Sequence, residues 1–170
     1  MINPRYFLLA AIAAFTLSGC GWTPPEEIAE VYDDLPEAIN FNYHVKPILS
    51  DKCFACHGPD AANQQANLRL DLEEFAFASL ESNSGKYAFV PGKPGRSEAV
   101  LRMLSKDEDY MMPPPGSHLI LEPREIAIIT KWVEQGAAYK PHWSFLKPVK
   151  NEPPHSQFDS WATSEIDQFV

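Results

Sequence analysis

Two closely spaced cysteines followed by a histidine constrain this chain more than any other feature. They are Cys53 and Cys56, and His57 comes directly after the second. In this pattern each thiol can add across one vinyl group of a porphyrin, because one helical turn brings both sulfurs to the same edge of the ring. The histidine then lies beneath the iron and can supply a neutral imidazole nitrogen as its axial ligand. The motif therefore predicts the covalent attachment of one haem c.

Two other kinds of site also use closely spaced cysteines. Half of a zinc site needs a second Cys/His pair at ligand spacing, and the sequence contains no such pair. A thioredoxin-like redox pair is expected within a βαβ unit, which the sequence around Cys53 does not indicate. We therefore prefer haem attachment to both alternatives.

The start of the chain is typical of an export signal rather than of a folded element. Arg5 is its only charge, and the apolar run that follows is too short to span a bilayer in the usual way. The run ends in Leu17-Ser18-Gly19-Cys20, which resembles the lipobox of bacterial lipoproteins. The resemblance implies that residues 1–19 are a signal peptide and that Cys20 carries acyl chains, which anchor a protein stably. An ordinary secretory signal and an uncleaved anchor are the alternatives.

The cysteine count and the charge bear on location and partners. The chain has three cysteines, one for the lipid and two for the haem, which leaves no spare thiol in an oxidising compartment. We expect export from the bacterial cytoplasm and lipid anchoring to a membrane, in the periplasm or at the cell surface. The formal net charge of −9 argues against nucleic acid as a partner and would favour a basic redox partner protein.

Composition divides the rest of the chain into segments. Residues 20–40 contain prolines and acids but no base, which predicts a flexible acidic tether, although Glu26–Tyr32 could form a short helix. We expect the folded domain at residues 41–140 and a proline-rich linker at residues 141–160. Residues 161–170 begin another apolar face, so we expect them to start a further domain of a longer chain.

Apolar residues at helical spacing predict that the folded domain is all-α, with long loops and room for a short hairpin. One such pattern runs from Phe41 to Cys53, and its helix either begins one position before Pro47 or is kinked there. Ser97 is a suitable N-cap for a later helix. Pro123 suits the first position of the last helix, and Gly136 suits its end.

A second axial ligand is expected from the segment that contains Met111 and Met112. A thioether opposite histidine is common in c-type haem proteins because it favours ferrous iron. We favour Met112, since the prolines after it would hold the backbone extended, and we place Met111 second and His118 third. Met103 lies within a predicted helix and is expected in the core, which is also the alternative for the other two methionines. The remaining imidazole candidates are His142 and His155.

Arg69 is a candidate contact for a haem propionate. It lies in Leu68-Arg69-Leu70-Asp71, where apolar and polar residues alternate as in a short strand or extended segment. An ion pair of Arg69 with Asp71 or Glu73 is the alternative.

Taken in order, these motifs closely resemble the planctomycete-type cytochrome c domain, over about residues 41–140. The residues that carry the resemblance are Val45-Lys46-Pro47-Ile48-Leu49, Cys53 to Gly58, Leu68 to Asp71, Val90-Pro91-Gly92-Lys93-Pro94, Ser97, Met112-Pro113-Pro114 and Trp132 to Ala137. The resemblance implies a small class I-like cytochrome c fold in which Met112, before the double proline, is the distal ligand. The segment from Pro141 to Phe145 and the end of the chain look like the junction to a larger domain of unknown function.

We therefore expect a membrane-anchored electron carrier rather than an enzyme, with the iron of one haem held by His57 and Met112. One alternative is a haem enzyme or sensor with an open distal site, peroxidase-like or gas-binding. Another is a structural haem module that tethers a C-terminal domain. The sequence shows no Ser/His/Asp set, no paired-carboxylate motif and no phosphate-binding glycine loop that would favour other chemistry.

Overall fold

The computed structural model describes residues 22–81, 85–141, 143–145, 147–150, 152–154 and 163–169. The predicted signal peptide and Cys20 lie outside these residues, as do His142 and His155. One compact unit of the chain ends at Lys140, and a second begins at Pro141.

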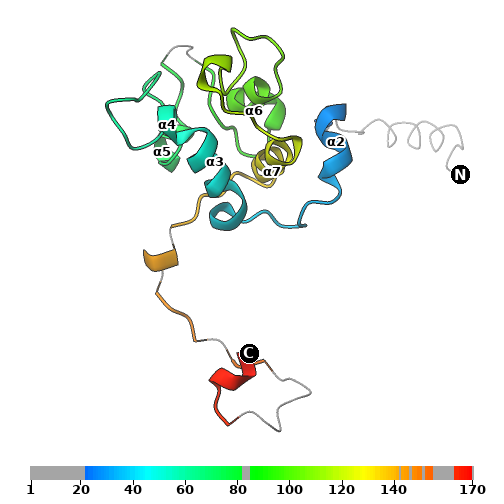
Figure 1. Cartoon of the computed structure of the whole chain (residues 1–170), viewed down its shortest axis with the longest axis vertical. Helices are drawn as coiled ribbons and strands as arrows, with labels where there is room; N and C mark the ends of the chain where they lie inside the picture. Colours follow the sequence, from blue (N-terminus) through cyan, green and yellow to red (C-terminus); the bar gives the residue numbers. More distant parts are fainter. Residues whose placement is uncertain are drawn as a thin grey trace, which may run out of the picture. The chain divides into compact units, whose positions relative to one another are not determined.

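The regular secondary structure in the described part of the first unit is helical, and loops join the helices (Figure 1). The α-helices are α2 (Glu26–Tyr32), α3 (Lys46–Lys52), α4 (Phe54–His57), α5 (Glu73–Ala76), α6 (Glu98–Met103) and α7 (Pro123–Glu134). The shorter turns are the π-helical η1 (Phe41–Val45) and the 3₁₀ turns η2 (Pro94–Arg96) and η3 (Pro115–Ser117). Across the described ranges there is no β-strand, and only single bridges join Ser79 to Tyr87 and Tyr87 to Ser97. The predicted all-α fold class is confirmed. The sequence left room for a short hairpin, and in the described residues only these bridges stand in its place.

The longest of these helices, α7, supports the core. It begins at Pro123 as predicted, and the Glu125 carboxylate accepts the N–H of Glu122 at 2.8 Å, which satisfies one free donor at the helix start. Gly136 follows the end of the helix with a φ of 103°, a conformation that favours glycine. The buried residues of α7 are Ala127, Ile129, Thr130, Trp132 and Val133.

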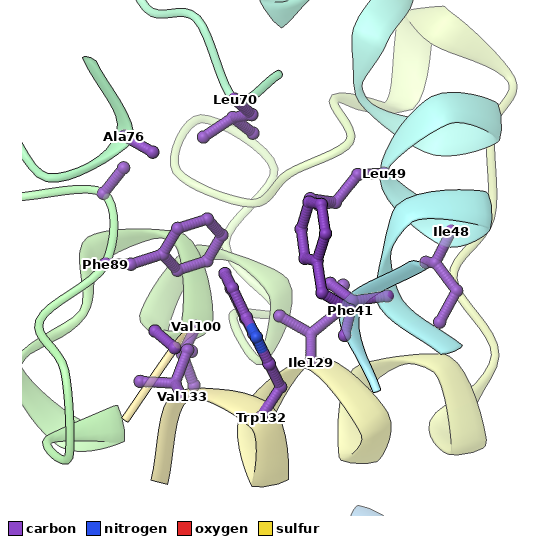
Figure 2. Packing of buried hydrophobic residues seen from close by; sticks show 13 residues of the cluster. Phe41, Ile48, Leu49, Leu70, Ala76, Phe89, Val100, Ile129, Trp132 and Val133 are labelled. Atoms are coloured by element: carbon purple, nitrogen blue, oxygen red, sulfur yellow. The ribbon is translucent and has the colours of Figure 1, made fainter. Parts of the chain in front are cut away.

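Trp132 lies at the centre of the hydrophobic core, between Phe41 and Phe89 (Figure 2). Its ring centroid is 5.6 Å from that of Phe41 and 5.2 Å from that of Phe89. The indole N–H donates to the carbonyl of Ala138 at 3.1 Å, so the polar atom of this buried ring is satisfied. The indole thus joins η1, α7 and the segment before α6 into one core.

Helix α3 leads directly into the cysteine motif. It starts at Lys46 with Pro47 in its first turn, where the missing N–H of proline has no cost. This confirms the predicted alternative in which the helix begins one position before Pro47. Ile48 and Leu49 bury one face of α3 in the core. The position of the motif therefore depends on the same core that surrounds Trp132.

The segment expected to be a flexible tether is folded in its described part. Helix α2 forms where the sequence allowed a short helix, and it packs against α7 (Figure 1). Ile28 is fully buried in a small cluster with Leu35 and Ala127. The burial of these side chains offsets the conformational entropy that a free tether would retain.

Polar contacts also fasten this segment. The hydroxyl of Tyr32 donates to the Glu134 carboxylate at 2.6 Å. The side chain of Gln135 accepts the N–H of Ile39 at 2.9 Å and donates to the carbonyl of Glu37 at 2.6 Å. The acidic segment is thus attached to α7 at several points along its length.

Ser97 occupies the N-cap position of α6, but its hydroxyl does not cap the helix. The oxygen accepts the N–H of Val90 at 2.8 Å, and the hydroxyl donates to the carbonyl of Lys93 at 3.0 Å. The predicted N-cap position is therefore right, and the predicted hydrogen bond is wrong because the preceding loop binds the side chain.

No described helix has the length and apolar character needed to cross a membrane.

The second unit contains the 3₁₀ turns η4 (Trp143–Phe145) and η5 (Ile166–Phe169). The carboxylate of Asp167 accepts the N–H groups of Thr163 and Ser164 at 2.9 and 2.8 Å. These bonds define a local turn at residues 163–169. A further domain beyond this turn stays a prediction.

Candidate functional site

The cysteines and the histidine of the motif lie at the junction of α3 and α4. Cys53 is the residue between the two helices, and its N–H donates to the carbonyl of Leu49 at 2.9 Å. The N–H groups of Cys56 and His57 both donate to the carbonyl of Cys53, at 3.1 and 2.8 Å. A single helical turn therefore carries Cys53, Cys56 and His57, as the spacing predicts.

Gly58 allows the chain to leave this turn directly after His57. A Cβ added at Gly58 would lie 2.6 Å from the Cβ of Phe54, so any larger residue would force the turn to move. The loop that follows returns to the motif, because the N–H of Leu70 donates to the carbonyl of His57 at 2.8 Å. The backbone of His57 is thus bonded both to the preceding turn, through Cys53, and to the following loop, through Leu70.

Both thiols of the motif are free and half-buried. Burial raises the pKa of the Cys53 thiol to about 12, and the negative charge of Glu125 acts in the same direction. A neutral buried thiol is a poor redox nucleophile, which counts against a thioredoxin-like pair. Within the described ranges no group of three or more His, Cys, Asp or Glu residues could hold a metal ion.

The imidazole of His57 is half-buried and incompletely hydrogen-bonded. Its Nδ1 atom is buried and has no hydrogen-bond partner. Burial lowers the pKa of His57, and the nearby backbone of Gln65 acts against this shift. The positive charge of Arg102 lowers the same pKa further. A neutral imidazole is the form that binds a metal, so a half-buried imidazole kept neutral beside two free thiols fits a covalently attached haem.

The two candidate methionines end a loop that lies against α6. In this methionine loop, Asp107–Met112, the N–H of Met111 donates to the carbonyl of Asp107 at 2.7 Å and closes a turn. The N–H of Met112 donates instead to the carbonyl of Arg102, in the last turn of α6, at 3.1 Å. Both methionines are half-buried. Met112 is thus attached directly to a helix, and Met111 only to its own loop.

Arg102 connects the methionine loop with the surroundings of His57. Its side chain donates to the carbonyl of Tyr110 at 3.2 Å, and its own carbonyl binds Met112. The same arginine is close enough to His57 for its charge to lower the pKa of the imidazole. Arg102 is thus bonded to the methionine loop, and its charge also acts on His57.

The other candidate ligands have different surroundings. Met103 packs against the hydrophobic core, which confirms its predicted position. His118 is exposed and has a positive φ of 56° at the end of η3. Of the distal-ligand candidates that the structure describes, Met112 is the one whose N–H is bonded to the carbonyl of Arg102.

Arg69 is held by the neighbouring Asp71. Its Nε and Nη2 atoms donate to the two carboxylate oxygens at 2.6 and 2.5 Å. These hydrogen bonds raise the pKa of Arg69 and lower the pKa of Asp71. The alternative ion pair is therefore present, and the propionate contact stays a prediction. Of the predicted short strand or extended segment, no strand forms at residues 68–71, and Leu70, whose N–H donates to the carbonyl of His57, is buried in a turn.

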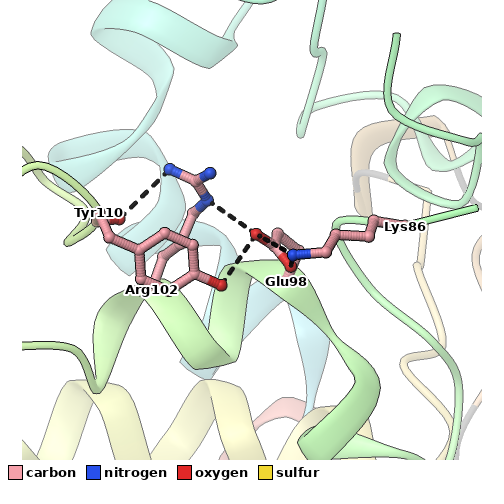
Figure 3. A network of polar contacts seen from close by, with 4 residues as sticks. All are labelled: Lys86, Glu98, Arg102 and Tyr110. Atoms are coloured by element: carbon pink, nitrogen blue, oxygen red, sulfur yellow. Dashed lines mark hydrogen bonds and ion pairs between the residues drawn. The ribbon is translucent and has the colours of Figure 1, made fainter. Parts of the chain in front are cut away.

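A buried carboxylate that the sequence pattern does not predict lies beside the methionine loop (Figure 3). Glu98 is 4% exposed, and its carboxylate accepts the Tyr110 hydroxyl at 2.8 Å. Arg102 Nε lies 3.3 Å from the same carboxylate, and Lys86 Nζ lies 3.0 Å from it. We call Lys86, Glu98, Arg102 and Tyr110 the Glu98 cluster. Its only signal in the sequence is the i,i+4 spacing of Glu98 and Arg102, which usually marks an exposed pair.

Comparison with known families identifies part of the chain. Residues 53–116 match the family model described as planctomycete cytochrome C, and the match contains the cysteine motif, α6 and the methionine loop. Neither a curated protein nor a solved structure matches the chain. The family agrees with the covalent haem chemistry that Cys53 and Cys56 allow. Residues 53–116 therefore form a domain of the planctomycete cytochrome c family, whose general role is to bind haem and carry electrons.

Proposed function

We propose that this chain is a membrane-anchored c-type cytochrome domain that transfers single electrons. The observation that carries the proposal is the single helical turn with Cys53, Cys56 and His57, inside the segment that matches the family. The free thiols and the unpartnered Nδ1 of His57 agree with a covalently held group at this turn. Haem c, when bound, would supply an iron centre that gains and loses one electron.

The residues of the site have separate roles in this proposal. Cys53 and Cys56 would hold the porphyrin by two thioether bonds, and His57 would supply a neutral imidazole to the iron. Met112 would supply a thioether as the second protein ligand, which would keep substrates from the metal and make the domain an electron carrier rather than an enzyme. The core around Trp132 supports α3 and thereby the turn that carries Cys53, Cys56 and His57, which we call the attachment turn.

Met112 is a better candidate for the distal ligand than Met111. Its N–H is bonded to the carbonyl of Arg102, so the backbone at this position is tied to α6. The N–H of Met111 is bonded to Asp107 within the loop and leaves that residue dependent on the loop conformation. A ligand must return to the same place in both oxidation states, which favours the residue attached to the helix.

The anchor at Cys20 and the external location are further parts of the proposal. The described chain begins at Trp22, whose ring lies against Gly95, and α2 packs on α7. If Cys20 carries the lipid, the domain stands next to the membrane surface rather than at the end of a long flexible tether. An acidic chain with a net charge of −9 favours a basic redox partner, and the second unit would lead into a further domain.

The proposal is tested by expressing the full chain in bacteria with c-type haem maturation and recording oxidised and reduced spectra after denaturing extraction. We expect haem to stay with the chain and to be lost in the double variant Cys53→Ala/Cys56→Ala. The matched control is Cys20→Ser, which should keep the haem and lose membrane association.

Three results would contradict the proposal. An exported, folded chain without covalent haem would refute haem attachment, and metal analysis for zinc would follow. Rapid carbon monoxide binding to the ferrous wild type would indicate an open distal site and favour the enzyme or sensor alternative. Haem that cannot be reduced and reoxidised without unfolding the chain would favour the structural module.

A further inference from the structure

The Glu98 cluster holds the end of the methionine loop through a buried carboxylate (Figure 3). The side chain of Glu98 is 5% exposed, although it is a carboxylate. It accepts the Tyr110 hydroxyl at 2.8 Å and lies within 3.3 Å of both Lys86 and Arg102. A buried charge of this kind needs partners because desolvation is costly, so each of these contacts restrains the residue that makes it.

Tyr110 is bound through three different parts of the residue. Its hydroxyl donates to Glu98, its carbonyl accepts from the Arg102 side chain at 3.2 Å, and the Arg102 guanidinium lies 4.4 Å from its ring centroid. Tyr110 is two positions before Met112, whose N–H is bonded to the carbonyl of the same arginine. The loop residues at 107–109 are exposed. The described attachments of this loop to α6 therefore converge on Glu98 and Arg102.

We propose that Glu98 and Tyr110 are positioning residues that keep Met112 within reach of the iron and so set how often the methionine leaves it. This inference rests on the proposed function, because it requires Met112 to be the distal ligand. Neither residue touches the iron in this proposal. Glu98 holds Tyr110, Tyr110 restrains the end of the loop, and the loop presents the methionine.

A general contribution to stability is the simpler explanation, and the chain offers a matched control for it. Tyr32 donates to Glu134 at 2.6 Å, a tyrosine–glutamate hydrogen bond between α2 and α7 whose carboxylate is exposed, unlike that of Glu98. Neither Tyr32 nor Glu134 belongs to the attachment turn, the methionine loop or the Glu98 cluster. If Tyr110 acts only on stability, Tyr110→Phe and Tyr32→Phe should have similar effects on the site.

The test measures how fast external imidazole displaces the distal ligand in the ferric, haem-loaded full chain, since displacement follows release of the methionine. We expect Tyr110→Phe to accelerate imidazole binding about tenfold, the factor that corresponds to the loss of one hydrogen bond to a buried charged acceptor. Glu98→Gln should accelerate it at least as much, and Tyr32→Phe should leave the rate within about twofold of wild type. The far-red absorption band of iron–thioether ligation should weaken in Tyr110→Phe at a denaturant concentration below that of global unfolding.

The outcomes separate this inference from the proposed function. A wild type with covalent haem and the far-red band, whose imidazole rate is unchanged by Tyr110→Phe, overturns the inference alone. A wild type that lacks the band overturns the inference together with methionine ligation, and one that lacks covalent haem overturns the proposed function. If Glu98→Gln does not fold, Tyr110→Phe, which removes a single hydroxyl, decides the question.

Discussion

The attachment turn and the methionine loop are held in place in different ways. In the attachment turn, the N–H groups of Cys53 and His57 bond to carbonyls four positions earlier in the chain. In the methionine loop, Met112 and Tyr110 depend on Arg102 and Glu98, which belong to a separate helix. The first region is organised by its own sequence, and the second by contacts with α6.

This difference has a consequence for the function that we propose. Covalent attachment requires only that two thiols and an imidazole share one turn, which local hydrogen bonds achieve. Methionine ligation also requires that the loop stay against α6 while the iron changes its charge. We therefore expect changes in the Glu98 cluster to affect the distal ligand and to leave covalent attachment intact.

Met112→Ala is expected to have the largest effect among the variants that distinguish the two regions. Covalent haem should remain, because the attachment turn is unchanged, while the far-red band should disappear and carbon monoxide should bind the ferrous form rapidly. Absorption spectra and stopped-flow mixing with carbon monoxide measure both changes. Met111→Ala is the control and should keep the band. Loss of the band only in Met111→Ala would show that the neighbouring methionine is the ligand.

Trp132→Ala tests whether the two regions share one core. The indole is 2% exposed and packs on Phe41, so its removal should cost about 3–5 kcal/mol of the free energy of unfolding, measured by urea denaturation. The attachment turn and the methionine loop should then unfold together in one urea transition. Tyr43→Ala, at a side chain that is 76% exposed, should change the free energy by less than about 0.5 kcal/mol. A loss below 1 kcal/mol in Trp132→Ala would contradict the central place of this residue.

Ile28→Ala tests a helix that belongs to neither region. Ile28 is fully buried against α7, so we expect a loss of about 2–4 kcal/mol from the packing of α2, seen in denaturation and in faster proteolysis near the N-terminus. The rate of imidazole binding should not change. The exposed Glu30→Ala provides the control for the helix itself. Equal proteolysis of the two variants would mean that α2 is not held by Ile28.

The smallest effect is expected from Arg69→Ala, and it should depend on pH. Hydrogen bonds from Arg69 lower the pKa of Asp71 in the folded state. The resulting stability is present above the unfolded-state pKa of about 4 and is lost as the pH falls through the lower folded-state value. The difference in stability between wild type and variant should therefore shrink in acid, as urea midpoints between neutral and acid pH will show. A change in the haem spectrum of Arg69→Ala would instead favour the propionate contact.

The features predicted correctly from the sequence depend on short-range rules. The helix after Glu122 begins at proline and ends before glycine, because both residues satisfy backbone requirements at helix ends. The turn with Cys53 and His57 follows from spacing alone. Ser97 shows the limit of such rules, since its position before α6 was predictable and the loop that takes its hydroxyl was not.

The features that were missed depend on partners far away in the sequence. The acidic composition before residue 40 predicted a free tether, but Ile28 packs against Ala127 on α7. Glu98 has the pattern of an exposed helix residue, and its burial depends on Lys86 and Tyr110 from two separate loops. Neither pairing leaves a periodic pattern in the sequence.

By itself, the sequence predicted the attachment turn, because the spacing of Cys53, Cys56 and His57 fits one helical turn. It also determined the all-α class, through the spacing of apolar residues. Only the tertiary structure decided which methionine is attached to a helix and which carboxylate is buried beside it. The physical reason is that a buried charge and a folded loop each need partners from other segments, and those partners meet only when the core has formed.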